Sequence, residues 1–261
     1  MRTKWASAGL MGLMLLGGSN AAAQSDFQWR GQVPSGQAIE IKGVNGDVRA
    51  TASSTGEVEV TATRTARRSN PADVRIEVIP HAGGVTICAV YPSVSGREPN
   101  RCEAGGEGRM NTKDNDTVVH FDVRVPYGVR FVGRTVNGEI NGESLQADAE
   151  AHTVNGSVRL TTTGVAVANT VNGSVNVTMG RADWPSDASF KTVNGGITLT
   201  LPSMLDVELR AETLNGSIAS DFPITVTGTV SPRRLRGRIG NGGHDLTLTT
   251  VNGSIKLLRG Q

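Results

Sequence analysis

The chain has 261 residues, 33 of them glycine and only 4% aromatic, and its 26 lysine and arginine residues nearly balance its 24 aspartate and glutamate residues. A net charge this close to zero argues against general electrostatic binding to nucleic acid or to an anionic membrane. Many glycines and few aromatic side chains suit a narrow β-structured core with tight corners better than a broad enzyme cleft.

Residues 1–23 have the pattern of a signal peptide. Arg2 and Lys4 form a short basic start, an apolar stretch follows, and three alanines at 21–23 supply the small residues that a signal peptidase reads. The apolar stretch is shorter than the roughly 20 residues that a membrane span needs. We therefore predict cleavage after Ala23, export to the periplasm or the cell surface, and no transmembrane segment in the remaining chain.

A short motif, Val-Asn-Gly or Leu-Asn-Gly and usually preceded by threonine, recurs through the rest of the chain. Its asparagines are Asn45, Asn137, Asn155, Asn172, Asn194, Asn215 and Asn252. The motif returns every 17 to 22 residues from Asn137 to Asn215, and the 37-residue step to Asn252 corresponds to about two such units. The 92-residue gap after Asn45 leaves room for several degenerate units and an insertion. A short, regular period predicts a repeat architecture.

An Asn-Gly pair between apolar residues normally indicates a two-residue hairpin, but the alternation of side chains disfavours one here. In such a hairpin Val171 would face Ser174, which would mix polar and apolar residues on each face. If the strand instead bends without reversing, Val171 and Val175 share one side while Thr170 and Asn172 share the other. We expect the glycine to supply left-handed backbone at each bend, and the asparagines of successive units to hydrogen-bond in a ladder.

A unit of 17 to 22 residues that turns without reversing matches one coil of a β-solenoid, whose coils pair about 4.8 Å apart. We predict an all-β fold with a single solenoid domain over residues 24–261. In it, Asn155, Asn172, Asn194 and Asn215 stack at one corner. An antiparallel β-sandwich or barrel of short strands is the alternative.

Other segments extend the β pattern. Residues 74–78 and 85–89 alternate on either side of a turn at 81–84, and residues 121–125 alternate up to Pro126. Cys88 and Cys102 are the only cysteines. In an oxidising compartment such a pair predicts a disulfide, here one that holds a loop insertion near residues 88–116.

The sequence provides no basis for catalysis, metal binding or a cofactor. The four histidines (His81, His120, His152 and His244) are scattered without ligand spacing, and the residues after Asn-Gly do not repeat an acidic pair. Three arginines, Arg234, Arg236 and Arg238, would share one face of a strand. This face either binds an anionic ligand or is a charged cover for an exposed sheet edge.

The repeats resemble those of the putative-adhesin family of bacterial envelope domains, most specifically at residues 239–243, 246–248 and 250–255. The resemblance extends from about Gly36 to Gln261. It implies a right-handed, β-helix-like solenoid with an adhesive or scaffolding role, and it brings no catalytic residues. The stretch at 93–116, which contains Cys102, departs from the plain repeat.

We therefore predict a non-catalytic, exported interaction or adhesion module of the cell envelope. Its partner would be an envelope protein or an anionic glycan, and not nucleic acid. Two alternatives belong to other classes: a polysaccharide-active enzyme on a β-helix, and a structural component of an envelope sensing system.

Overall fold

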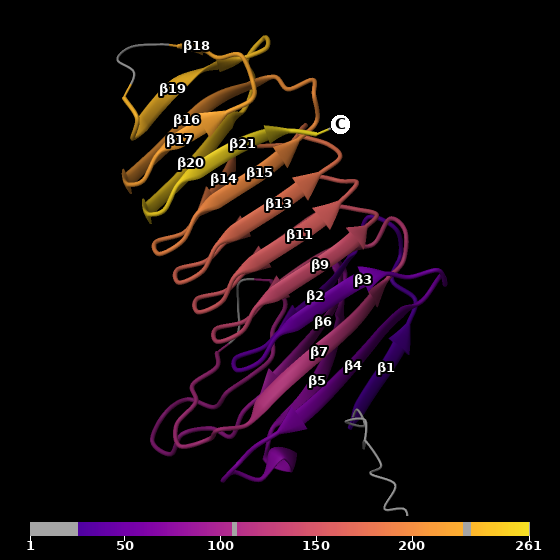
Figure 1. Cartoon of the computed structure of the whole chain (residues 1–261). Helices are drawn as coiled ribbons and strands as arrows, with labels where there is room; N and C mark the ends of the chain where they lie inside the picture. The colour runs from indigo at the N-terminus through magenta and orange to yellow at the C-terminus, as the bar shows by residue number, and fades with distance from the viewer. Residues whose placement is uncertain (1–25, 106–108, 227–230, 261) are drawn as a thin grey trace, which may run out of the picture.

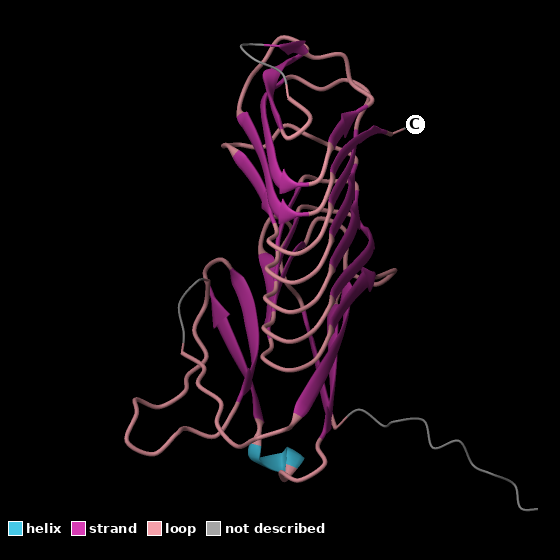
Figure 2. Ribbon diagram, turned by 60° about the vertical axis from the view of Figure 1, so that its left-hand side comes forward, coloured by secondary structure: helices cyan, strands magenta, loops and turns pink. Residues whose placement is uncertain are grey.

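Two long sheets, A and B, run along the molecule, and the core lies between them (Figures 1 and 2). The computed structural model describes residues 26–105, 109–226 and 231–260, so the expected signal peptide lies outside the described residues. In spatial order, sheet A contains β1 (Phe27–Gly31), β4 (Val58–Thr65), β7 (Val118–Val125), β3 (Val48–Ala52), β9 (Ile140–Leu145), β11 (Val158–Thr162), β13 (Val175–Met179), β15 (Ile197–Leu201), β21 (Ile255–Arg259) and β17 (Ile218–Ser220). Sheet B contains β18 (Thr225–Val226), β19 (Arg234–Ile239), β16 (Val207–Asn215), β20 (Asp245–Asn252), β14 (Ala188–Lys191), β12 (Ala166–Asn169), β10 (Ala149–His152), β8 (Arg130–Arg134), β2 (Ala38–Lys42), β6 (Gly84–Val90) and β5 (Arg75–His81).

Each coil consists of a sheet B strand, a connection and a sheet A strand, and in every coil except β6–β7 the connection is a corner that carries the Val-Asn-Gly or Leu-Asn-Gly motif. The coils β8–β9, β10–β11, β12–β13 and β14–β15 follow one another along the chain and stack in parallel (Figure 1). Within β11, Val158 and Leu160 are buried while Arg159 and Thr161 are exposed, because alternate side chains of a strand point to opposite faces. The predicted all-β solenoid is confirmed, and the antiparallel alternative is wrong for the stacked coils.

The spatial order of the coils differs from their chain order at both ends. The coil β20–β21, last in the described chain, lies between β14–β15 and β16–β17. At the other end, β6–β7 lies outside β2–β3, so β2–β3 pairs with β8–β9. The gap after Asn45 therefore holds one parallel coil and the antiparallel strands β4 and β5, rather than several degenerate units.

Antiparallel strands cover the ends of the stack. On sheet A, β4 pairs with β7 and β1 with β4; on sheet B, β5 pairs with β6 and β19 with β16. The expected strands at 74–78 and 85–89 form the β5–β6 hairpin, and β7 ends at Val125, directly before Pro126. The only helical element of the described residues is one 3₁₀ turn, Pro71–Asp73, and none of their helices has the length and hydropathy for crossing a bilayer.

Six of the seven motifs are preceded by a threonine that points inward, and in five of them the next apolar residue is exposed, so the predicted phase is wrong at these corners. The first motif differs, because Gly43 replaces the threonine and Val44 is buried. Thr170 is 5% exposed, whereas Val171 is 39% exposed. The chain turns within the motif, and the alternation restarts after it, with Val175 buried again. Thr170 tolerates burial because its hydroxyl donates a hydrogen bond of 2.8 Å to the carbonyl of Gly156 in the neighbouring coil. The threonines that donate in the same way are Thr135, Thr153, Thr192, Thr213 and Thr250.

Close approach between coils, rather than left-handed backbone, explains the corner glycines. Among the described corner glycines only Gly46 has a positive φ, of 125°. A Cβ atom on Gly156 would lie 2.0 Å from the carbonyl oxygen of Gly138 in the adjacent coil. Because the backbones stack this tightly, any larger residue would force the coils apart.

Candidate functional site

The seven motif asparagines lie in one column along the corner. Each amide from Asn137 onward donates from Nδ2 to Oδ1 of its neighbour, at 2.7 or 2.8 Å, in the order Asn45, Asn137, Asn155, Asn172, Asn194, Asn252 and Asn215. Asn252 therefore separates Asn194 from Asn215, because its coil is inserted there. The column is uniform and its amides bond to one another, so we assign it a structural role.

The Cys88–Cys102 disulfide is present, with the two Cα atoms 5.7 Å apart. It holds the loop that connects β6 to β7 against sheet B. Glu103 accepts a 2.6 Å hydrogen bond from Lys42 through its carbonyl, and Gly105 donates a 2.9 Å bond to Glu40. Asn100, which is buried, bonds both arms of the loop. The loop is thus fastened to β2 as well as to β6.

The three arginines at 234, 236 and 238 do share the exposed face of β19. Arg234 bonds Glu212, and Arg238 lies 3.1 Å from Glu208, both on the neighbouring strand β16. Arg236 faces Arg210, which is itself paired with Asp245 at 3.0 Å. Acidic neighbours that are distant in the sequence therefore offset most of the positive charge on this face.

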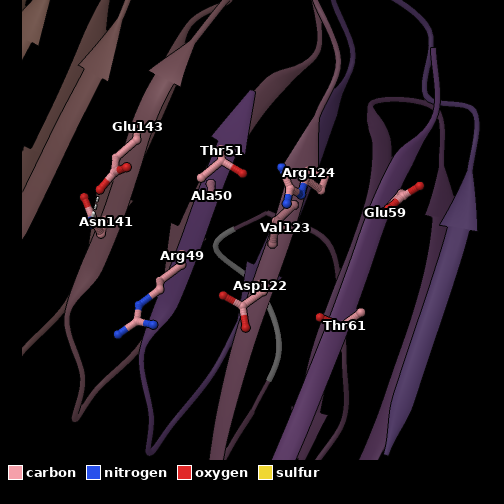
Figure 3. A pocket seen from close by; sticks show the side chains of 10 residues that line it. All are labelled: Arg49, Ala50, Thr51, Glu59, Thr61, Asp122, Val123, Arg124, Asn141 and Glu143. Atoms are coloured by element: carbon pink, nitrogen blue, oxygen red, sulfur yellow. Dashed lines mark hydrogen bonds between the residues drawn. The ribbon is translucent and has the colours of Figure 1, made fainter. Parts of the chain in front are cut away.

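A polar hollow of about 620 Å³ lies on the outer face of sheet A, over β9, β3, β7 and β4 (Figure 3). Strand register places two rows of polar side chains across it. One row is Asn141, Arg49, Asp122 and Thr61, and the next is Glu143, Thr51, Arg124 and Glu59. Neighbouring strands hold these side chains about 4.8 Å apart.

Several charges in this hollow have no partner within the described residues. Arg49, Arg124 and Asp122 form no ion pair or side-chain hydrogen bond there, whereas Glu59 lies 3.4 Å from Arg30. The Oδ1 atom of Asn141 is buried without a partner, although its Nδ2 donates to Glu143 at 2.9 Å. Unpaired guanidinium groups on a rigid sheet remain available for an external ligand.

A β-bulge shapes one wall of the hollow. Register between β9 and β11 shifts past Glu143, and Ser144 has a positive φ of 53°, which is unusual outside glycine. The bulge leaves both Glu143 and Ser144 exposed and returns Leu145 to the core. Bulges are common next to functional sites. The bulge is therefore a second indication, after the unpaired charges, that this hollow is a functional site.

A network of charged residues crosses the outer face of sheet B. The buried carboxylate of Glu40 accepts hydrogen bonds from Thr86 at 2.8 Å and from Arg134 at 3.0 Å. Arg134 also bonds Glu150 at 2.5 Å, and Nε2 of His152 lies 2.7 Å from the same oxygen. Because these carboxylates are paired, the network links coils to one another.

We expect protein stability to fall in acid through Glu150. The hydrogen bond from His152, together with the charge of Arg134, lowers the pKa of Glu150 to about 2 despite partial burial. A lowered pKa means that the ionised form stabilises the fold above pH 4.5, and that this contribution is lost as the pH falls toward 2. The melting temperature of Glu150→Gln should therefore lie below that of the wild type at pH 7, and the difference should shrink between pH 4.5 and pH 2. A constant difference across that range would contradict this assignment.

The histidines and acidic residues that the structure describes lie too far apart to form a metal centre. Among the residues that the structure describes, no three His, Cys, Asp or Glu side chains are arranged to hold an ion. The four histidines lie apart, three on separate strands and His244 in the connection from β19 to β20. Their contacts are local, since His81 bonds Thr86 and His120 lies beside Asp47.

The sequence did not predict the polar hollow on sheet A, because its residues come from four segments that become neighbours only through the order of the coils. The one available signal was the run of charged residues at alternate positions of predicted strands, such as Asp122 and Arg124. That pattern equally describes an ordinary exposed face.

Comparison with known proteins identifies the family. Residues 131–258 match the family model described as Toastrack DUF4097. This part of the chain is a Toastrack domain. The match confirms the family resemblance expected from the repeats. The Toastrack domain begins within β8, so the hollow combines its first coil with β3, β7 and β4 from the preceding segment.

Two solved structures show a distant similarity. A putative cell adhesion protein from Clostridium sporogenes ATCC 15579 aligns over 90% of this chain and 99% of its own, with 10% identity and a TM-score of 0.42. A putative adhesin from Bacteroides fragilis NCTC 9343 aligns over 89% of this chain and 96% of its own, with 14% identity and a TM-score of 0.35. No curated protein sequence matches the chain. At this similarity neither protein's description transfers to this chain.

Proposed function

We propose that the protein is a non-catalytic, exported binding module of the cell envelope that acts in adhesion. Its ligand is an anionic glycan, which it contacts through the polar hollow on sheet A. The observation that carries this proposal is the pair of guanidinium groups, Arg49 and Arg124, that face outward without a partner among the described residues.

The chemistry of the hollow suits an acidic polysaccharide. Guanidinium groups donate paired hydrogen bonds to carboxylate, sulfate or phosphate groups. Asn141 and Thr51 supply amide and hydroxyl groups, and Asp122 can accept hydrogen bonds from sugar hydroxyls. Because the sheet fixes the strands that carry these side chains, little backbone entropy is lost on binding.

The electrostatics support binding rather than glycan hydrolysis. A glycosidase needs an acid whose raised pKa keeps a proton near neutral pH. Among the described residues, the carboxyl groups with a clearly changed pKa are Asp116, Glu150 and Asp183, and each pKa is lowered. Lowered values suit permanent ion pairs and hydrogen-bond anchors.

We expect the double variant Arg49→Gln/Arg124→Gln to bind purified anionic envelope polysaccharide at least about a hundredfold more weakly than the wild type, because the loss of two charge-assisted contacts costs about 1.5–3 kcal/mol each. Binding should be measured by cosedimentation at two salt concentrations, and the variant should also show a flatter salt dependence. Both side chains are surface groups, so stability should change by less than about 0.5 kcal/mol per substitution.

The matched control is Arg233→Gln/Arg236→Gln, which removes two arginines on or beside β19. Neither side chain forms an ion pair with a described residue. Unchanged binding by this control supports the hollow as the site. If the control variant loses binding and Arg49→Gln/Arg124→Gln retains it, the binding site is the β19 face and the proposal for sheet A is wrong. Turnover of the polysaccharide by the wild type would overturn the non-catalytic assignment.

A further inference from the structure

A long connection between two coils forms a separate cavity on sheet B. Residues 180–187 connect β13 to β14, where residues 163–165 suffice between β11 and β12. The cavity has a volume of about 310 Å³ and lies between this connection and strands β8, β10 and β12. It lies on the other sheet from the polar hollow and shares none of its lining residues.

The connection is an ordered structure rather than a loose loop. Trp184 is 5% exposed, and its indole Nε1 donates a 3.0 Å hydrogen bond to the carbonyl of Ala166. Its ring packs edge-on against Phe190, with ring centroids 6.4 Å apart. Arg181 clamps Asp183 through two hydrogen bonds of 2.9 and 2.7 Å. The cavity is therefore preformed, as small-molecule sites usually are.

One part of the cavity lining is apolar and aromatic. It consists of Phe131, Ala149, Val165, Ala166, Val167, Trp184 and Pro185. A wall of this kind accommodates a short hydrocarbon stem, and the indole ring also attracts a cation. The volume lies at the lower end of the range for ligand pockets, about 300–1,000 Å³, so a small group fits.

The remaining lining is acidic. Asp148, Glu150 and Asp187 face a single cation, Arg130, within the lining. Just outside it, Arg134 and His152 contact Glu150, and Nδ1 of His244 lies 3.8 Å from Oδ1 of Asp187. Asp148 Oδ1 accepts the Val165 amide at 3.0 Å and Asp187 Oδ1 accepts the Asp245 amide at 3.0 Å. Glu150 uses Oε1 for its bonds to Arg134 and His152.

In each of the three carboxylates, a single oxygen thus accepts all of the hydrogen bonds from the protein. The second oxygen of each forms no hydrogen bond with a described residue. Three anchored carboxylates with an available oxygen, beside an apolar wall, complement a group that is both cationic and carried on a hydrocarbon chain.

We propose that this cavity binds a primary ammonium group on a short alkyl stem. The ammonium donates its hydrogen bonds to the available oxygens of Asp148, Glu150 and Asp187, and the stem contacts Trp184 and the valines. The ammonium can come from a free alkylamine or from a lysine side chain. The proposal does not depend on the glycan site.

The test titrates the full chain with Nα-acetyl-lysine methylamide, pentylamine and Nα-acetyl-norleucine methylamide. The readout is the indole N–H resonance of Trp184, distinguished from those of Trp5 and Trp29 by substitution. We expect a saturable shift for both amines, and binding of the norleucine derivative at least tenfold weaker. Tighter binding of the lysine derivative assigns a protein side chain as the source, and equal or tighter binding of pentylamine assigns a free amine.

Two variants test the acidic lining. Asp148→Asn/Asp187→Asn retains an oxygen that can accept each backbone amide but removes both charges, and it should weaken amine binding at least tenfold. Asp221→Asn is the matched control, because Asp221 also accepts a backbone amide, that of Arg259, and does not line the cavity. Ser186→Trp should block binding without any change of charge.

The proposal is overturned if the Trp184 resonance does not respond to either amine, or if the norleucine derivative binds as tightly as the lysine derivative. It is also overturned if folded Asp148→Asn/Asp187→Asn retains wild-type affinity. If that double variant does not fold, the test rests on Ser186→Trp. Amine binding by Ser186→Trp with wild-type affinity would also overturn the proposal.

Discussion

The Gly156→Ala variant is expected to lose about 3 kcal/mol of folding free energy, a large effect for one methyl group. The added Cβ would lie 2.0 Å from the carbonyl oxygen of Gly138 and 2.5 Å from its carbonyl carbon. Backbone atoms cannot move aside as a flexible side chain can, so the two coils must separate. Their separation would also stretch the hydrogen bond from Thr153 to the carbonyl of Gly138, which is 2.9 Å long.

The measurement is urea unfolding of the variant, compared with the wild type and with Gly56→Ala. Gly56 is the matched control, because no atom lies within 4 Å of a Cβ added there and its φ is not positive. The control should differ from the wild type by less than about 1 kcal/mol. Equal stabilities for the two alanine variants would show that the coils can separate at little cost, contrary to the close stacking described above.

Removal of the disulfide in Cys88→Ala/Cys102→Ala is expected to destabilise the protein by about 3 kcal/mol, the loop-closure estimate for a loop of about 15 residues. The two cysteines are 14 positions apart and both are buried. Without the bond, the unfolded chain gains freedom. In the folded state the loop is then held by weaker contacts, such as the hydrogen bond from Gly105 to Glu40.

Urea unfolding with and without a reductant provides the test. The wild type should lose stability on reduction and approach the double variant, while the double variant should not respond. Mass spectrometry of the non-reduced protein should find the peptides of Cys88 and Cys102 linked. Free thiols at both positions, or a reductant effect on the double variant, would contradict the prediction.

Some features of the corner motif could be predicted from the sequence and others could not. Asn172 and its counterparts recur at a regular period, which is enough to predict a stack. The inward position of Thr170 was not predictable from alternation, because alternation assumes an extended chain and the backbone turns within the motif. The need for glycine was predicted, but its reason is contact with a neighbouring coil rather than local backbone conformation.

The surface sites depended on tertiary structure to a greater degree. Spacing predicted that Arg234, Arg236 and Arg238 share a face, but not that Glu212 and Glu208 on β16 would offset two of them. Similarly, Arg49 and Asp122 become neighbours only because β7 lies beside β3, a pairing that no local pattern indicates.

The sequence by itself determined the all-β class, the length of one coil, the column of asparagines and the cysteine pair. Each of these follows from local periodicity or from residue chemistry. Tertiary structure alone decided the order of the coils, including the insertion of Asn252 between Asn194 and Asn215. The physical reason is that the repeated coils present nearly the same backbone and the same inward side chains to their neighbours. Local sequence therefore favours stacking without specifying which coil stacks on which, and the antiparallel strands and long connections set that order.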